Sequence, residues 1–257
     1  MSSGATFEIY HGDCRQFLAH MPDNHFQLIL TDPPFNISSE LVIHRASNLK
    51  YKGKDISHDF GEWDKFESEE QFWEFVDSWL SHLVRVLEPN RHMVIFFDFN
   101  RCGDLIRRAE KLGMKFRKPL YWIKSNPVPR ARKVDCMRSI EVACWFTKGE
   151  VKQDYYNWQL GQTLDYVKCG IPHGKSRVHP TQKPVEFWER WVLYLSKPGE
   201  IVFDPFCGSG SSLVAALKHG RRAVGVDQEE EYVAHAAKWC LETVPQERLR
   251  LEEEQDD

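Results

Sequence analysis

The stretch EIVFDPFCGSGSSLVAALKHGRRAVGVD, residues 200–227, decides the fold that the sequence predicts. An apolar run of strand length enters a loop with two glycines, a helical stretch follows over 211–218, and a second apolar run ends at Asp227. Gly208 and Gly210 lack a Cβ, so a ligand can lie against this loop. The free N–H groups of the helix suit an anion, and Asp227 suits ribose hydroxyls. The stretch therefore predicts a Rossmann-like α/β unit that binds a nucleoside ligand.

Two other interpretations of this stretch stay open at this point. A glycine pair after a strand also fits a tight turn in any α/β protein, and Asp227 could cap the helix that follows it. A dehydrogenase is disfavoured, because no third glycine stands where a dinucleotide fingerprint needs one.

The alternation of strand and helix continues through the rest of the chain. Apolar runs predict strands at 26–31, 92–99, 119–124 and 141–148, and helical spacing predicts helices at 69–87, 102–111, 185–195 and 230–243. The runs at 119–124 and 141–148 are close enough to pair antiparallel. The irregular segment 36–63 is typical of a functional loop. Repeated βα units predict one mostly parallel sheet with helices on both faces.

The composition fits one large soluble α/β domain. The chain has 257 residues, of which 42% are hydrophobic and 28% charged. It has no apolar run of about 18 residues and no signal-like start, so we expect a cytoplasmic protein without a membrane partner. The seven cysteines form no CxxC pair and show no zinc spacing, which predicts reduced thiols and no metal. The acidic residues 251–257 are typical of a solvated tail.

The charge is unevenly distributed, although the net charge is only -4. Lysine and arginine dominate residues 115–138, where Asp135 is the one acid. This segment is a candidate phosphate-facing patch; the alternative is a solvated strand and loop.

The string TDPPF, residues 31–35, follows the apolar strand run 26–31 and suits catalysis at an amino group. The exocyclic amine of adenine or cytosine is a poor nucleophile, and two acceptors that bind its protons activate it. Asp32 and the Pro33 carbonyl are such acceptors, the prolines hold them in place, and Phe35 offers a platform for a flipped base. The alternative is a Pro-Pro turn with a core Phe. Because strand ends share a sheet edge, we expect TDPPF and the glycine loop to meet in one crevice.

Five strings stand in a characteristic order: HGDC (11–14), TDPPFN (31–36), WIKSNPVP (122–129), HPTQKP (179–184), and FDPFCGSG through GVD (203–227). With them the chain resembles the β group of DNA amino-methyltransferases, the permuted class in which the catalytic motif precedes the cofactor loop. The resemblance implies a methyltransferase fold that uses S-adenosylmethionine. It also implies a catalytic part at 1–150 with its loop at 31–36, a short target-recognition insertion at 151–178, and a cofactor-binding part of the same domain at 179–250.

The resemblance also assigns residue roles. Thr181 and Lys183 are expected near the methionine carboxylate, and Asp13 near the adenosyl group unless it only caps a helix. The position of Phe35 is more often Tyr in this group, and Ser211-Ser212 replace common threonines. The expected catalytic residues are Asp32, Pro33, Pro34 and Phe35. The expected cofactor-binding residues are Asp13, Asp32, His179, Thr181, Lys183, Asp204, Phe206, Gly208, Ser209, Gly210 and Asp227. The candidates for DNA contact are Lys124, Asn126, Arg130, Arg132, Lys133, Arg138, Lys175 and Arg177.

The leading hypothesis is a site-specific enzyme that methylates adenine N6 in double-stranded DNA by base flipping and direct attack. The acid at position 32 favours adenine by family tendency, but cytosine N4 presents the same two protons and is the first alternative. An RNA or protein-amide methyltransferase and an inactive DNA-binding module are further alternatives. The expected partners are duplex DNA in the nucleoid, a second copy of the chain and a cognate restriction enzyme.

Overall fold

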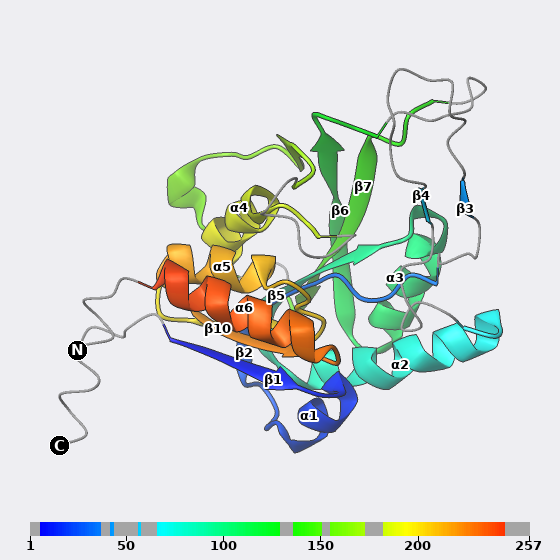
Figure 1. The fold of residues 1–257 in the computed structure, drawn as a ribbon. Helices are drawn as coiled ribbons and strands as arrows, with labels where there is room; N and C mark the ends of the chain where they lie inside the picture. Colours follow the sequence, from blue (N-terminus) through cyan, green and yellow to red (C-terminus); the bar gives the residue numbers. More distant parts are fainter. Residues whose placement is uncertain are drawn as a thin grey trace.

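The computed structural model describes residues 6–36, 42–43, 56–57, 66–128, 136–150, 155–172 and 182–244. Its main feature is an eight-stranded sheet in the order β1-β10-β9-β2-β5-β7-β6-β8 (Figure 1). The strands of this sheet are β1 (Phe7–His11), β2 (Phe26–Thr31), β5 (Leu87–Phe97), β6 (Met114–Lys124), β7 (Ile140–Lys148), β8 (Tyr166–Cys169), β9 (Ile201–Asp204) and β10 (Arg222–Asp227). A separate pair contains β3 (Val42–Ile43) and β4 (Ile56–Ser57).

The sheet is mostly parallel, as predicted. The strands β1, β10, β9, β2 and β5 pair in parallel, and β7 runs antiparallel between β5 and β6. The predicted antiparallel pairing of 119–124 with 141–148 is confirmed by the register, in which Leu120 lies opposite Ala143. Because β7 is reversed, its amino end lies at the edge where the parallel strands have their carboxyl ends.

Helices cover both faces of the sheet, which confirms the predicted layers (Figure 1). On one face lie α1 (Cys14–His20), α2 (Glu69–Val86) and α3 (Cys102–Lys111); on the other lie α4 (Val185–Leu195), α5 (Ser211–Lys218) and α6 (Glu230–Thr243). The Ser68 hydroxyl accepts a hydrogen bond from the Gln71 N–H at 3.1 Å and so caps α2. Across the described ranges, none of the helices is long and apolar enough to cross a membrane.

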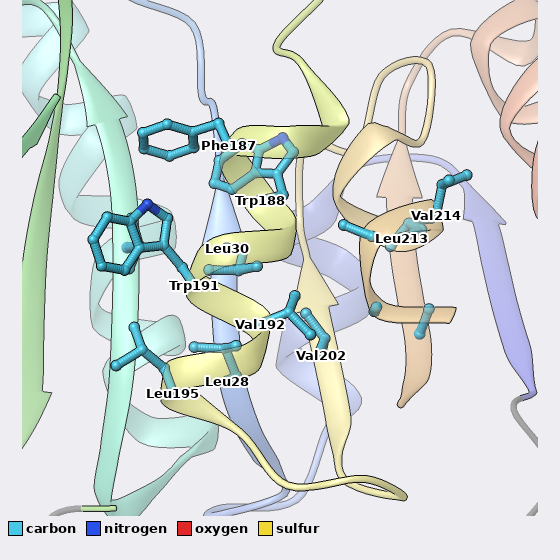
Figure 2. Packing of buried hydrophobic residues seen from close by; sticks show 14 of the residues in the cluster. Leu28, Leu30, Phe187, Trp188, Trp191, Val192, Leu195, Val202, Leu213 and Val214 are labelled. Carbon is cyan, nitrogen blue, oxygen red and sulfur yellow. The ribbon is translucent and has the colours of Figure 1, made fainter. Parts of the chain in front are cut away.

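The core follows the alternation of side chains along β2. Leu28 and Leu30 point to the layer of α4 and α5, and Ile29 points to the layer of α2. Figure 2 shows helix α4, which carries Trp188 and Trp191, lying over Leu28 and Leu30 in the same cluster. All five side chains are buried. The central strands are therefore covered on both faces, and only their ends are free to form a site.

Several elements differ from the sequence prediction. Helix α2 ends at Val86, and β5 begins already at Leu87, because Leu87 pairs with Phe26 across a register shift. The predicted insertion 151–178 contributes β8, which adds a parallel strand to β6, with Val167 opposite Trp122. This strand has four residues and buries only Val167, so it carries too little periodicity to be recognised. The role of this segment in target recognition stays a prediction.

Candidate active site

An aspartate stands at the carboxyl end of each of four neighbouring parallel strands. Asp204 and Asp227 close β9 and β10, and Asp32 and Asp98 follow β2 and β5. All four line one cavity of about 980 Å³ at this edge of the sheet. Pro33, Pro34 and Phe35 line the same cavity, as do Phe206, Gly208 and Ser209. The loop at residues 31–36 is named the catalytic loop for its predicted role, which stays a prediction. Its predicted meeting with the glycine loop (residues 204–210) in one crevice is confirmed.

Two aspartates hold the glycine loop in place. The Gly208 N–H donates to Asp227 Oδ2 at 2.7 Å. Asp204 accepts from the Phe206 N–H at 3.1 Å and from the Ser212 hydroxyl at 2.5 Å. The shape of the glycine loop is therefore fixed by hydrogen bonds from its own backbone N–H groups to these two carboxylates. Asp227 also accepts from the Glu229 N–H at 3.0 Å, so it orders the turn that precedes α6.

Gly208 and Gly210 serve different purposes. Gly208, with a φ of 48°, lines the cavity, where a ligand can approach its backbone. Gly210 packs against α6: it has a φ of 87°, and a Cβ there would lie 2.8 Å from the Cβ of Ala236. The glycine at 210 is thus explained by left-handed backbone and close helix packing, a reason that differs from the predicted ligand contact.

Burial raises the pKa of both aspartates at the glycine loop. For Asp204 it raises the pKa to about 7; the hydrogen bonds from Ser212 and the Phe206 N–H oppose the rise, and the nearby charge of Asp32 adds to it. For Asp227 burial also raises the pKa, against the hydrogen bonds from the Glu229 and Gly208 N–H groups. Burial therefore makes both carboxylates easier to protonate than an exposed aspartate.

The catalytic loop is held at one end by a chain of alternating charges. The Lys183 ammonium lies 2.5 Å from Asp32 Oδ2 and 3.3 Å from Glu141 Oε2. Glu141, at the amino end of β7, also pairs with Lys124 at 2.6 Å. The Lys183 side chain is only 3% exposed, and its ammonium lies 5.4 Å from the centre of the Phe35 ring. Lys183, predicted to lie near a methionine carboxylate, thus contacts the catalytic loop in this structure.

These buried groups stabilise one another in their charged forms. Burial alone would lower the pKa of Lys183, but the carboxylates of Asp32 and Glu141 raise it above its ordinary value. Burial alone would raise the pKa of Glu141, but Lys183 and Lys124 bring it below its ordinary value. Asp32 therefore faces a permanent cation, which favours the ionised carboxylate.

Arg101 holds the other end of the catalytic loop. Its guanidinium donates to the Phe35 carbonyl at 2.7 Å and binds Glu69 of α2 through two further bonds of 2.7 and 3.0 Å. The same group lies 4.8 Å from the centre of the Phe72 ring. A planar fork bound on two sides and stacked on a ring has little freedom to move. Arg101 therefore fixes the backbone beside the expected base platform.

Aromatic side chains form an apolar wall of the cavity. Phe66, Phe75 and Phe206 line it, and the Phe206 ring lies 5.5 Å from that of Trp79 and 6.1 Å from that of Phe75. The sequence predicted Phe75 only as part of a helix face. Its contribution to the site depends on where α2 crosses the sheet, which helical spacing does not reveal.

The structure gives Asp13 a structural task. Its carboxylate caps α1 by accepting from the Arg15 N–H at 2.8 Å, and it forms an ion pair with the Arg15 side chain at 2.5 Å. Its neighbours Gly12, Cys14 and Arg15 line the large cavity, and Asp13 lines a smaller pocket beside it. A role of Asp13 in cofactor binding stays a prediction.

The predicted DNA-contact residues fall into three groups. Lys124 lies in the cavity wall on Glu141, and Arg138 is exposed at the same cavity. Asn126 connects two loops: its amide accepts from the Ile171 N–H at 2.6 Å and donates to the Ile171 carbonyl at 3.4 Å. The remaining candidates lie outside the described residues, as do two of the predicted cofactor residues: Arg130, Arg132, Lys133, Lys175, Arg177, His179 and Thr181.

Sequence reasoning missed the groups that hold the catalytic loop, namely Glu69, Arg101 and Glu141. A signal existed for Glu141, which is the only charged residue between 139 and 147 and stands at the start of a predicted strand. A signal also existed for Asp98, which ends an apolar run as Asp32 and Asp227 do.

Comparison with known proteins places this geometry in a family. The model of the N6/N4 DNA methylase family matches residues 26–238. The Type II methyltransferase M2.DpnII of Streptococcus pneumoniae is 32% identical over 241 residues, which cover 90% of this chain and 88% of that protein.

Two solved structures share the fold. The M1.HpyAVI–SAM complex has a TM-score of 0.69 and 22% identity, covering 91% of this chain and 99% of that one. The PvuII DNA methyltransferase, described as cytosine-N4-specific, has a TM-score of 0.71 and 18% identity, covering 92% and 87%. Because the family match spans the catalytic loop, the glycine loop and the sheet between them, the chain belongs to the N6/N4 family of DNA methylases.

Proposed function

We propose that this protein transfers a methyl group from S-adenosylmethionine to the N6 atom of adenine in double-stranded DNA. One observation carries the proposal: Asp32, which forms an ion pair with Lys183, lines the same cavity as the glycine loop. An acceptor for an amino group and a nucleoside site are thereby brought within reach of each other, which a two-substrate transfer requires.

The residues present suit S-adenosylmethionine. Gly208 and Ser209 offer backbone at the amino end of α5, and Asp227 and Glu229 stand at the end of β10, where acids bind ribose hydroxyls. The wall formed by Phe66, Phe75 and Phe206 suits an adenine ring. The cavity, with about 980 Å³, lies at the upper end of the range of about 300–1,000 Å³ for ligand pockets, which leaves room for a nucleotide base as well. The similar fold of M1.HpyAVI, solved as a complex with SAM, supports this choice.

When bound, S-adenosylmethionine supplies a methyl group on a positively charged sulfur. The chain's task is to make the amino nitrogen nucleophilic. Asp32 accepts a hydrogen bond from the amino group, with the Pro33 carbonyl as the second acceptor, and Lys183 keeps the carboxylate ionised and oriented. The nitrogen gains the methyl carbon as the carbon–sulfur bond breaks, and it then loses one proton to water.

Phe35 is the platform for the flipped base in this proposal. Its side chain is half-buried at the cavity, next to Asp32 in the chain, and its backbone is fixed by Arg101. A base that leaves the duplex would stack on this ring while its amino group reaches Asp32.

Adenine is preferred over cytosine because position 32 carries an acid, as in the adenine enzymes that the sequence resembles. Restriction-modification is the proposed setting, since the relative M2.DpnII is named a Type II methyltransferase. A second copy of the chain and a cognate restriction enzyme remain the proposed partners, and the host cytoplasm the proposed location.

Expression in a host that lacks DNA methylation tests the function directly. Nucleoside mass spectrometry should detect N6-methyladenine, and modification-sensitive sequencing should place it at one short sequence. N4-methylcytosine in its place would overturn the choice of base. Unmodified DNA alongside soluble, folded protein would overturn the proposal as a whole.

A further inference from the structure

Phe99 occupies an unusual position for an aromatic side chain. It is 77% exposed, more than any other large hydrophobic side chain among the described residues, and it lines the cavity that holds Asp32. A single exposed apolar residue needs no explanation in general. An exposed ring on the wall of a proposed base-flipping cavity does call for an explanation, because the DNA must approach this cavity in the proposed reaction.

Phe99 stands in a turn that hydrogen bonds hold together. It begins the short 3-10 helix η2 (Phe99–Arg101), which is separated from β5 by Asp98 alone. The Asp98 carbonyl accepts from the Arg101 N–H at 2.9 Å and from the Cys102 thiol at 3.4 Å. The turn therefore holds Phe99 in a defined place, as an inserting side chain requires.

The same turn is connected to the catalytic loop. Arg101, two residues after Phe99, donates to the Phe35 carbonyl and is held by Glu69. Arg101 therefore connects the turn that carries Phe99 with the backbone of the proposed base platform Phe35. This connection limits how far the two rings can move relative to each other.

The cavity that Phe99 lines suits a nucleic acid. Val128 and Ile140 are also exposed apolar residues that line the cavity, and Arg138 is an exposed cation there. Apolar groups complement base faces, and a cation complements phosphate. The rim thus offers both kinds of contact that an opened duplex needs.

We infer that Phe99 inserts into the base stack of the DNA at the place that the flipped nucleotide leaves. The inference rests on the proposed function and adds to it a side chain that stabilises the extruded state. Phe and Leu are among the side chains that proteins insert between base steps, and the opened stack would lose its contacts without such a group.

The test compares two DNA duplexes that contain the sequence found by methylation mapping. One is fully paired, and the other has an abasic site opposite the target base, which removes most of the cost of extrusion. Phe99→Ala should lower the methylation rate on the paired duplex by at least about tenfold and on the abasic duplex by less than about threefold. Phe99→Leu should stay within about threefold of the wild type on both, since Leu also fills an opened stack.

Leu112→Ala is the matched control, because Leu112 is 41% exposed at the carboxyl end of α3, away from the cavity. It should behave as the wild type does on both duplexes. Equal rates of Phe99→Ala and wild type on the paired duplex would overturn the inference. So would an equal loss on both duplexes, or a loss of S-adenosylmethionine affinity. A folded wild-type chain that methylates neither duplex would instead overturn the proposed function.

Discussion

The glycine loop and the catalytic loop open into one cavity but are held by different kinds of contact. Backbone N–H groups hold the glycine loop: those of Phe206 and Gly208 donate to nearby aspartates, and that of Cys207 donates to the Val226 carbonyl at 3.0 Å. Charged side chains from distant parts of the chain, Lys183 and Arg101, hold the catalytic loop.

This difference should make turnover and cofactor binding respond differently to substitutions. A loop held by its own backbone keeps its shape when a distant side chain is changed. A loop held by ion pairs loses its alignment when one partner is removed, and an activated acceptor depends on alignment. We therefore expect distant substitutions to lower turnover while cofactor binding persists, and substitutions at the glycine loop to act first on folding stability.

The largest effect is expected for Lys183→Met, which removes the cation between Asp32 and Glu141. Breaking a buried pair costs about 3–5 kcal/mol, which corresponds to a fall in kcat of about 150- to 5,000-fold if the whole cost is added to the activation barrier. The cofactor dissociation constant, measured by calorimetry, should change by less than about threefold because the glycine loop is intact. Lys218→Met, which removes an exposed cation on α5, is the control. A weaker cofactor affinity at unchanged kcat would instead place Lys183 on the methionine carboxylate.

The next effect concerns the pH dependence of stability. The pKa of Asp204 is about 7 in the fold, above its ordinary value of 3.8, so the folded state keeps a proton that the unfolded state has lost. Stability from this group is fully present below pH 4 and is lost as the pH rises to 7, by up to about 4 kcal/mol. Asp204→Asn lacks this titrating group. In denaturant unfolding, the free energy of unfolding of the variant should therefore rise relative to that of the wild type between pH 4 and pH 8. Parallel curves would contradict the account.

A smaller effect is expected for Gly210→Ala. The new Cβ would lie 2.8 Å from the Ala236 Cβ on a backbone with a φ of 87°. Left-handed strain and overpacking together should lower the free energy of unfolding by about 2–3 kcal/mol. Gly220→Ala isolates the strain, because Gly220 has a φ of 71° and no atom within 4 Å of the added Cβ. Equal destabilisation of the two variants in thermal unfolding would show that packing against α6 is unimportant.

The smallest effect is expected for Glu69→Gln, which weakens the ion pair that holds the Arg101 guanidinium. The side chain of Glu69 is 50% exposed, so the pair contributes no more than about 1 kcal/mol, and kcat should fall by about three- to fivefold. Glu70→Gln is the matched control, since Glu70 is an exposed acid in the same first turn of α2. A Glu70 variant as slow as the Glu69 variant would attribute the effect to the helix end and not to Arg101.

The same difference explains what the sequence could predict. The strand, loop and helix around residues 203–218 follow from apolar periodicity and from the backbone freedom of glycine within a short stretch, and α5 has the predicted bounds. The helix at 185–195 was predicted correctly for the same reason. The resemblance to a known family added the expected catalytic and cofactor-binding residues.

The contacts that hold the catalytic loop could not be predicted in this way. Lys183 and Asp32 are 151 residues apart in the chain, and Arg101 and Phe35 are 66 apart. No local pattern connects such pairs, because they form only where β7, α2 and the segment before α4 meet at one sheet edge. The strand β8 was missed for a different reason, since four residues with one buried side chain give no periodic signal.

Transfer of a labelled methyl group from S-adenosylmethionine to duplex DNA, by the wild type and by Asp32→Asn, tests the central claim most directly. Asn keeps the size of the side chain but removes the charge, and Lys183 keeps Glu141 as a partner. The wild type should label DNA, and the variant should bind the cofactor with an affinity within about threefold yet label DNA at least about 100-fold more slowly. Equal labelling by the two proteins would contradict the assignment of Asp32, and a folded wild type that labels no DNA would contradict the account.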